Sequence, residues 1–153
     1  MAKQQVIEQR ATTIAPPEVV YGLLADGSTW PSWSPIGQFE LLEPGEREGD
    51  QPEGRNAVRL FTTGRTKSRE RVVETRPNQV FSYTLEHGMP LRDYKAVVTL
   101  TRNGAGTSIE WRSTFFVTRP GTGWIYRTFL GRFIGRAVQG LAQGAAALVG
   151  SAS

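Results

Sequence analysis

The alternation of hydrophobic and polar residues divides most of the chain into seven predicted strands. Period-2 alternation, in which every second residue is apolar, is typical of a strand with one buried face. Turn formers such as Gly64, Pro77-Asn78 and Asn103-Gly104 separate several of these segments. The predicted strands cover residues 4–14, 39–42, 56–62, 66–75, 79–86, 93–101 and 107–117. Because short turns join most successive strands, we expect an antiparallel sheet.

Two short helices are predicted between the first and second strands. The first covers residues 18–25, because the prolines before it suit a first helical turn and Glu18 favours the helix dipole. Asp26-Gly27 interrupts this helix, and a further helical turn over residues 28–33 ends before Pro35. A polar loop rich in turn formers is expected over residues 43–54.

The last segment, residues 124–149, changes to helical periodicity. Arg132, Arg136, Gln139 and Gln143 fall on one side of it, opposite an apolar stripe. The stripe consists of Tyr126, Phe129, Leu130, Phe133, Ile134, Ala137, Gly140, Leu141, Gly144 and Leu148. The apolar faces of helix and sheet must bury each other. We therefore predict an α+β fold, a curved seven-stranded antiparallel sheet wrapped around a long C-terminal helix, with room for a cavity between them.

The amino-acid composition excludes several kinds of functional site. The chain has 153 residues, which predicts a single domain over residues 1–153 with a sizeable core. It has no cysteine and one histidine, which excludes disulfides, a thiolate nucleophile and a multi-histidine metal site. No phosphate-binding loop, dinucleotide fingerprint or metal-ligand spacing is present, so we expect no metal and no cofactor.

The charge is moderately basic. The chain has 18 Lys and Arg against 14 Asp and Glu, a net charge of +4, which we interpret mainly as a solvated surface. The arginines are spread along the chain without a nucleic-acid motif, so we expect no nucleic-acid partner. No secretory signal or spanning apolar run is present, so we expect a cytoplasmic protein. Arg132 and Arg136, with Arg127 at their edge, leave peripheral membrane contact as an alternative, and the oligomeric state is left open.

Several short segments resemble those of the helix-grip superfamily, which includes START domains, polyketide cyclases and plant allergens. They are residues 15–21 leading into the first helix, 30–35 after the short helices, 88–94 in a hairpin, 106–111 with a Gly-Thr-x-x-x-Trp pattern, and 120–124 before the last helix. The resemblance spans nearly the whole chain. It implies the helix-grip fold, with two short helices between the first two strands, and a ligand such as a lipid, a polyketide or an aromatic metabolite.

The inner faces of the sheet and the long helix supply the candidate ligand-binding residues. The candidates are Trp30, Trp33, Tyr83, Tyr94, Val98, Trp111, Ser113, Phe129, Phe133, Ala137, Gly140 and Gly144. Together they would form an apolar pocket with a few polar tips. Gly140 and Gly144 would either make room for a ligand or allow close packing of the helix end on the sheet. Trp30 and Trp33 would either gate the pocket or pin the short helices to the core.

Arg69 and Arg71 are candidates for contact with an anionic group. They alternate with Glu70 in a predicted strand, so an inward-facing arginine could hold a ligand carboxylate or phenolate through two hydrogen bonds. On an exposed face they would instead pair across strands with Glu74 or Glu110.

The sequence identifies no catalytic set, and His87 is one more weak candidate. It lies at a predicted hairpin and could transfer protons near neutral pH. We expect the protein to bind a small hydrophobic ligand in the internal cavity. The first alternative is an enzyme of the polyketide cyclase or dehydratase type, with His87, Tyr94, Arg69 and Arg71 as possible proton-transfer groups. The second is a protein-interaction domain with a filled core.

Overall fold

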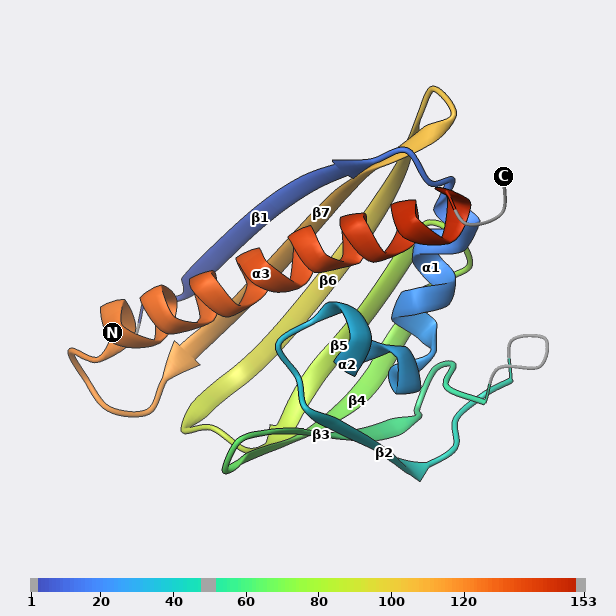
Figure 1. Cartoon of the computed structure of the whole chain (residues 1–153). Coiled ribbons are helices and arrows are strands. Elements are labelled where there is room, and N and C mark those ends of the chain that lie inside the picture. The colour runs from blue at the N-terminus through green and yellow to red at the C-terminus, as the bar shows by residue number, and fades with distance from the viewer. Residues whose placement is uncertain (1–2, 48–51, 151–153) are drawn as a thin grey trace.

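The computed structural model describes residues 3–47 and 52–150, which form one curved sheet and a long helix that crosses it (Figure 1). The elements in chain order are β1 (Gln5–Thr13), α1 (Pro17–Ala25), the 3-10 turn η1 (Gly27–Thr29), α2 (Trp30–Trp33), β2 (Gln38–Glu43), β3 (Val58–Thr63), β4 (Thr66–Arg76), β5 (Val80–His87), β6 (Leu91–Asn103), β7 (Gly106–Val117) and α3 (Gly123–Gly150). Residues 48–51 of the predicted polar loop lie outside the described residues.

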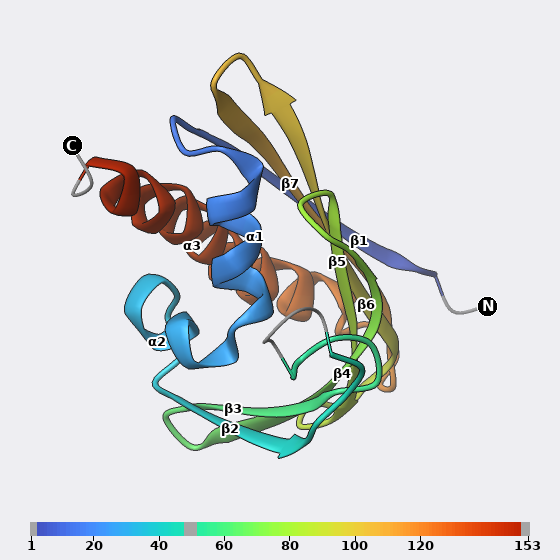
Figure 2. The ribbon, with the colours of Figure 1, turned by 90° about the vertical axis from the view of Figure 1, so that its right-hand side faces the viewer.

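The sheet is antiparallel, with the strand order β1-β7-β6-β5-β4-β3-β2. It curves strongly, and α3, α1 and α2 lie within the curve (Figure 2). The predicted α+β helix-grip fold is therefore confirmed. The predicted ends of the strands and of α1 and α3 agree with the observed ones to within two residues, and the predicted turn over residues 28–33 corresponds to η1 followed by α2.

Local sequence explains how α1 begins and ends. Pro16 is extended at φ −70° and ψ 160°, and Pro17 occupies the first turn, where its missing N–H leaves no hydrogen bond unmade. At the other end, the Asp26 side chain accepts a hydrogen bond from the Ser28 backbone N–H at 3.1 Å. Asp26 thus closes α1 and starts η1, which carries the chain directly into α2.

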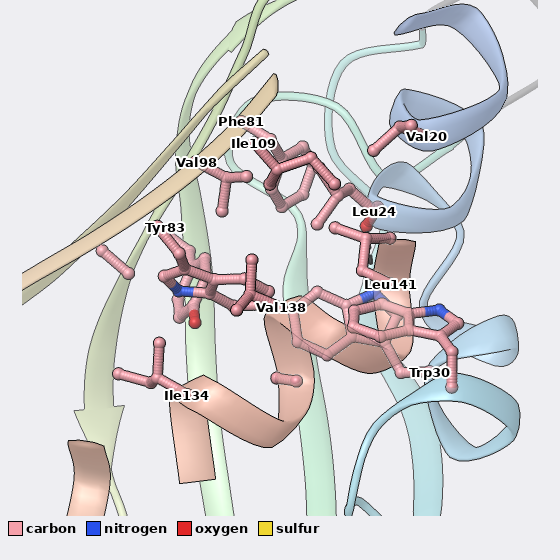
Figure 3. Close-up of a cluster of buried hydrophobic side chains, with 14 of the residues drawn as sticks. Val20, Leu24, Trp30, Phe81, Tyr83, Val98, Ile109, Ile134, Val138 and Leu141 are labelled. Atoms are coloured by element: carbon pink, nitrogen blue, oxygen red, sulfur yellow. Dashed lines mark hydrogen bonds between the residues drawn. The ribbon is translucent and has the colours of Figure 1, made fainter. Parts of the chain in front are cut away.

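The core lies between the concave face of the sheet and the three helices. Figure 3 shows side chains of β5, β6 and β7 (Phe81, Tyr83, Val98 and Ile109), of α1 (Val20 and Leu24) and of α3 (Ile134, Val138 and Leu141) pointing toward one another. Trp30 is at the centre of the aromatic part, with its ring centroid 4.8 Å from that of Phe61 and 5.7 Å from that of Trp111. The aromatic packing holds α2 against the sheet.

The rotation of α3 differs from the prediction. Its buried side chains are Leu130, Ile134, Ala137, Val138, Leu141, Ala142 and Ala145. Phe129 and Leu148, which the periodicity places on the inner face, are 60% and 50% exposed. Hydrogen bonds from β1 explain the difference, because Gln9 donates to the Gly131 carbonyl at 3.2 Å and Thr13 to the Ala142 carbonyl at 2.8 Å. These bonds turn the helix toward β1 and leave the Phe129 edge outside.

The length and hydropathy of the helices also bear on membrane contact. Within residues 3–47 and 52–150, none of the helices combines the length and the apolar character that crossing a bilayer requires.

Candidate functional site

A cavity of about 120 Å³ lies between the sheet, α2 and the N-terminal half of α3. One wall is apolar and comes from α3, with Leu130 and Ile134 among its residues. The opposite wall comes from β3, β4 and β5 and carries several polar side chains. The lining residues are Trp30, Ile36, Phe61, Thr63, Thr66, Ser68, Glu70, Tyr83, Leu85, Met89, Tyr94, Phe129, Leu130, Phe133 and Ile134.

The most unusual residue of the polar wall is Glu70. Alternation along β4 turns Ser68, Glu70 and Val72 toward the interior, while their neighbours face solvent. Glu70 is half-buried as a whole, but its Oε1 is sheltered and has no hydrogen-bond partner among the described residues. A carboxyl oxygen in this position has lost water without gaining a protein partner, which is unfavourable unless the group is protonated or binds something else.

Arg59 lies directly across from Glu70 in the register of β3 and β4, yet it does not form an ion pair with it. The fully buried guanidinium turns the other way. Its Nη1 lies 3.4 Å from Glu53 Oε1 and donates to the Leu24 carbonyl at 3.0 Å. Its Nε and Nη2 have no hydrogen-bond acceptor among the described residues. They lie among the rings of Trp30, Phe61 and Phe81, whose centroids are 4.8 to 5.0 Å from the guanidinium carbon.

Glu53 completes this buried pair from the loop before β3. It accepts a hydrogen bond from the Gly27 backbone N–H at 2.9 Å, so it joins the loop to η1. Burial raises the pKa of Glu53, while the charge of Arg59 works in the opposite direction. Burial also lowers the pKa of Arg59, partly offset by Glu53 and Glu70. The orientation of Arg59 toward Glu53 is what leaves Glu70 without a cationic partner.

The protonation of Glu70 follows from its surroundings. Burial raises the pKa of Glu70 to about 8, and the more distant charge of Arg59 only partly opposes this shift. Because that value lies above neutrality, the carboxyl is mostly protonated at pH 7 and can donate a hydrogen bond into the cavity.

Two tyrosines complete the polar end of the cavity. The Tyr94 hydroxyl is bonded to Ser113 Oγ at 3.0 Å, and the Tyr83 ring lies edge-on to that of Trp111, with 6.4 Å between the ring centroids. Burial raises the pKa of both phenols, so both stay neutral over the physiological range. The cavity therefore presents neutral hydrogen-bonding groups beside a large apolar surface.

The structure brings together five of the twelve predicted ligand-binding residues. Those that line the cavity are Trp30, Tyr83, Tyr94, Phe129 and Phe133. Val98, Trp111, Ser113 and Ala137 are buried in the core without lining it. Trp33, Gly140 and Gly144 meet one another elsewhere along α3, away from the cavity.

Gly140 and Gly144 serve close packing, and their partner is α2 rather than the sheet. A Cβ at Gly140 would collide with the Trp33 carbonyl oxygen, and one at Gly144 would lie 3.2 Å from Trp33 Cβ. Trp33 and Trp30 are themselves buried, and each indole N–H is bonded, to Thr29 Oγ1 and to the Leu24 carbonyl respectively. The glycines therefore allow close packing instead of making room for a ligand. The tryptophans pin the short helices to the core instead of gating the cavity.

Arg69 and Arg71 are on the outer face of the sheet. Arg71 Nε lies 2.8 Å from Glu86 and Arg69 Nε lies 3.3 Å from it, while Glu43 is 3.4 Å from Arg69. These partners replace the predicted Glu74 and Glu110. Glu86 is on β5, which pairs with β4, whereas Glu110 is on β7, three strands away, and Glu74 lies beside Arg76 on β4 itself. The hydrogen bond from Arg71 holds the pKa of Glu86 below its usual range. Between these two arginines, it is Glu70 that faces inward.

His87 is exposed at the end of β5 and is not among the residues that line the cavity. Its hairpin contributes Met89 to the lining instead.

The sequence contained a signal for Glu70 that the prediction did not use. Val72, two positions later, is apolar in an otherwise charged strand. Because alternate residues share one face of a strand, it indicates that Glu70 faces inward as well. Arg59 and Glu53 had no comparable signal. Val58, Leu60 and Phe61 are apolar on both faces of β3, and Glu53 lies in a loop.

Comparisons with known proteins identify the family and the fold. Residues 4–150 match the sequence model of a family described as polyketide cyclase / dehydrase and lipid transport. No curated protein matches the chain by sequence. A START superfamily protein from Mycobacterium smegmatis has a similar structure, with a TM-score of 0.77, 15% identity, and coverage of 94% of this chain and 98% of that one.

Two further solved structures are similar. A protein from Thermobifida fusca gives a TM-score of 0.71 at 22% identity, covering 94% of each chain. The protein Ara h 8.0201 gives a TM-score of 0.69 at 16% identity, covering 94% of this chain and 98% of that one. At these identities the comparisons establish a common fold.

Proposed function

This chain belongs to the polyketide cyclase, dehydrase and lipid transport family, and from that membership together with the cavity we propose that it binds a small hydrophobic molecule between the sheet and α3. The observation that carries the proposal is the mainly apolar space beside Leu130, Ile134 and Tyr83. Burial of an apolar ligand there would contribute about 25 cal/mol for each Å² removed from water.

The size of the cavity limits what it takes in this conformation. An apolar cavity of about 150 Å³ holds one benzene molecule, whereas drug-sized ligands need about 300–1,000 Å³. The 120 Å³ beside α3 therefore accommodates about one six-membered ring. A larger lipid or polyketide would extend past Phe129 and Phe133, which line both the cavity and the neighbouring surface groove.

A cavity-filling substitution tests the proposal. Ser68→Phe places a phenyl ring in the cavity, whereas Thr114→Phe adds the same ring to the outer face of β7. We expect toluene to raise the melting temperature of the wild type and of Thr114→Phe, and to have no effect on Ser68→Phe. Native mass spectrometry of protein from its own host, followed by organic extraction, would identify the natural ligand. Absence of both a copurified molecule and any toluene response in the wild type would refute the proposal.

The convergence of Glu70, Tyr83 and Tyr94 on one cavity favours a second candidate function, acid–base catalysis of the cyclase or dehydratase type. A carboxyl group that titrates near neutral pH is suited to proton transfer. A molecule extracted from the protein would serve as the test substrate. Turnover that Glu70→Gln abolishes would support catalysis, and an unchanged molecule would support binding alone.

The surface beside the cavity supports one further element of the proposal, contact with an anionic membrane. Trp124, Ile125 and Phe129 are 63%, 46% and 60% exposed, and Arg132 and Arg136 line the same groove. α3 has no acidic residue to oppose these arginines. We expect the protein to sediment with vesicles containing phosphatidylserine and not with neutral phosphatidylcholine vesicles. Equal sedimentation with both, or with neither, would contradict this contact.

A further inference from the structure

The cavity is lined by a carboxyl group, that of Glu70, for which the described residues provide no partner. Glu70 Oε1 is sheltered, and no described residue forms a hydrogen bond or an ion pair with this carboxyl. The cross-strand residue that would neutralise it, Arg59, is instead held by Glu53 and by the Leu24 carbonyl. The carboxyl group of Glu70 therefore faces a mainly apolar cavity and is free to form a hydrogen bond with a ligand.

The groups around Glu70 come from β3, β4, β5, β6 and α3, and two of them, Arg59 and Tyr94, are bonded to other partners. Arg59 faces it from β3, Tyr83 from β5 and Tyr94 from β6. Leu130 and Ile134 close the site from α3 and carry no charge, and the other cavity residues of β4 are Thr66 and Ser68. The Tyr94 hydroxyl is bonded to Ser113, and the Tyr83 ring packs edge-on against that of Trp111.

We propose that the protonated Glu70 carboxyl donates a hydrogen bond to a carbonyl oxygen of the bound molecule, and that the cavity thereby selects a ligand with an apolar ring and a ketone-like head. This inference rests on the proposed binding function and specifies its ligand class. A carbonyl oxygen accepts hydrogen bonds and donates none, so it matches a protonated acid. A neutral carbonyl group also avoids burying a charge in the cavity.

The electrostatics of the site give this recognition a pH dependence. Burial raises the pKa of Glu70 to about 8, so the donor is present at pH 6 and lost at pH 9.5. The ionised carboxylate at high pH would repel the partial negative charge of a carbonyl oxygen. The neighbouring phenols stay neutral at both values, because burial raises the pKa of Tyr83 and of Tyr94 as well.

Two probes of nearly equal shape isolate the hydrogen bond. Acetophenone has a carbonyl group where α-methylstyrene has a methylidene group, and each places one phenyl ring in the cavity. Their dissociation constants would be measured by calorimetry at pH 6 and pH 9.5 for the wild type, Glu70→Gln and Glu70→Leu. Glu70→Gln keeps an N–H donor but does not titrate, and Glu70→Leu removes the donor while keeping a similar volume.

For the wild type we expect acetophenone to bind about fivefold more tightly than α-methylstyrene at pH 6, the effect of one net hydrogen bond, and to lose this preference at pH 9.5. Glu70→Gln should keep the preference at both pH values, and Glu70→Leu should lack it at both. Equal binding of the two probes to the wild type, or a preference that grows with pH, would overturn the inference while leaving the proposed binding function intact. Binding of toluene but of neither probe would also overturn the inference alone. If neither probe binds and the wild type shows neither a toluene response nor a copurified molecule, the proposed function itself fails.

Discussion

The two halves of α3 differ in how they meet the rest of the molecule. In the C-terminal half, Gly140 and Gly144 let α2 approach until the backbone of Trp33 touches the helix. In the N-terminal half, Phe129 is exposed and the helix lies over a cavity. The comparison teaches that glycines on a buried helical stripe mark a close approach, whereas the open space lies beneath the large side chains.

The largest effect is expected at the buried pair behind the cavity. Arg59→Met leaves the Glu53 carboxylate without its cation, and breaking such a buried pair lowers the free energy of unfolding by about 3–5 kcal/mol. Urea unfolding would measure it. The double variant Arg59→Met with Glu53→Gln should recover part of the loss, because it removes the isolated charge. A single variant as stable as the wild type would contradict a structural role for this pair.

The contrast between glycines within α3 gives the next largest effect. Gly140→Ala should lower the free energy of unfolding by about 1–3 kcal/mol, because the added Cβ collides with the Trp33 carbonyl. Gly131→Ala meets nothing within 4 Å and should raise it by up to about 1 kcal/mol through helix propensity. Chemical denaturation of the two variants measures the difference. If both substitutions are stabilising, the tight contact with α2 does not exist in solution.

The protonation of Glu70 predicts a stability difference that depends on pH. The raised pKa means that the folded state holds a proton that the unfolded state releases above pH 4.5, so this group lowers stability as the pH rises from 4.5 to 8. Relative to Glu70→Gln, the wild type should lose about 2 kcal/mol over this range. Per pKa unit, this loss is smaller than the ~1.4 kcal/mol expected of a fully buried group, because Glu70 is half-buried. A constant difference between pH 4.5 and pH 8 would show an ordinary pKa.

The smallest effect on stability compares the exposed side chains at the two ends of α3. Phe129→Ala should change the free energy of unfolding by less than about 0.5 kcal/mol and weaken ligand binding several-fold, because the ring borders the cavity. Leu148→Ala, at the other end of the helix, should leave binding unchanged. Toluene titration of both variants separates these effects. Equal binding by the two would place the ligand away from Phe129.

The fold was predictable because its signals are repetitive. Alternation defined each strand, and the long apolar period defined α3, so errors of a residue or two at the ends did not change the architecture. The rotation of α3 was not predictable, since it depends on hydrogen bonds from Gln9 and Thr13, which lie more than a hundred residues away in sequence.

The candidate site was predictable only in its aromatic part. Trp30, Tyr83 and Tyr94 were identified because large apolar residues on an inner face usually approach a cavity or a core. Glu70 was not predicted, because a strand with charged residues at most positions suggests exposure to solvent on both faces. The prediction therefore considered only the two arginines beside it. A shift of one residue along β4 would exchange its inner and outer faces, so it would decide which charged side chain turns inward. In the sequence, only the apolar Val72 indicates which alternate residues face inward.

Mapping of a bound ring by NMR tests the central claim most directly. The ¹H–¹³C and ¹H–¹⁵N spectra of the wild type would be followed during titration with acetophenone at pH 6. We predict shifts concentrated at Leu130, Ile134, Leu85 and Met89, with little change at Gly140 and Gly144. Saturable shifts centred on the Gly140–Gly144 segment, or no saturable shifts at all, would contradict a binding site beneath the N-terminal half of α3.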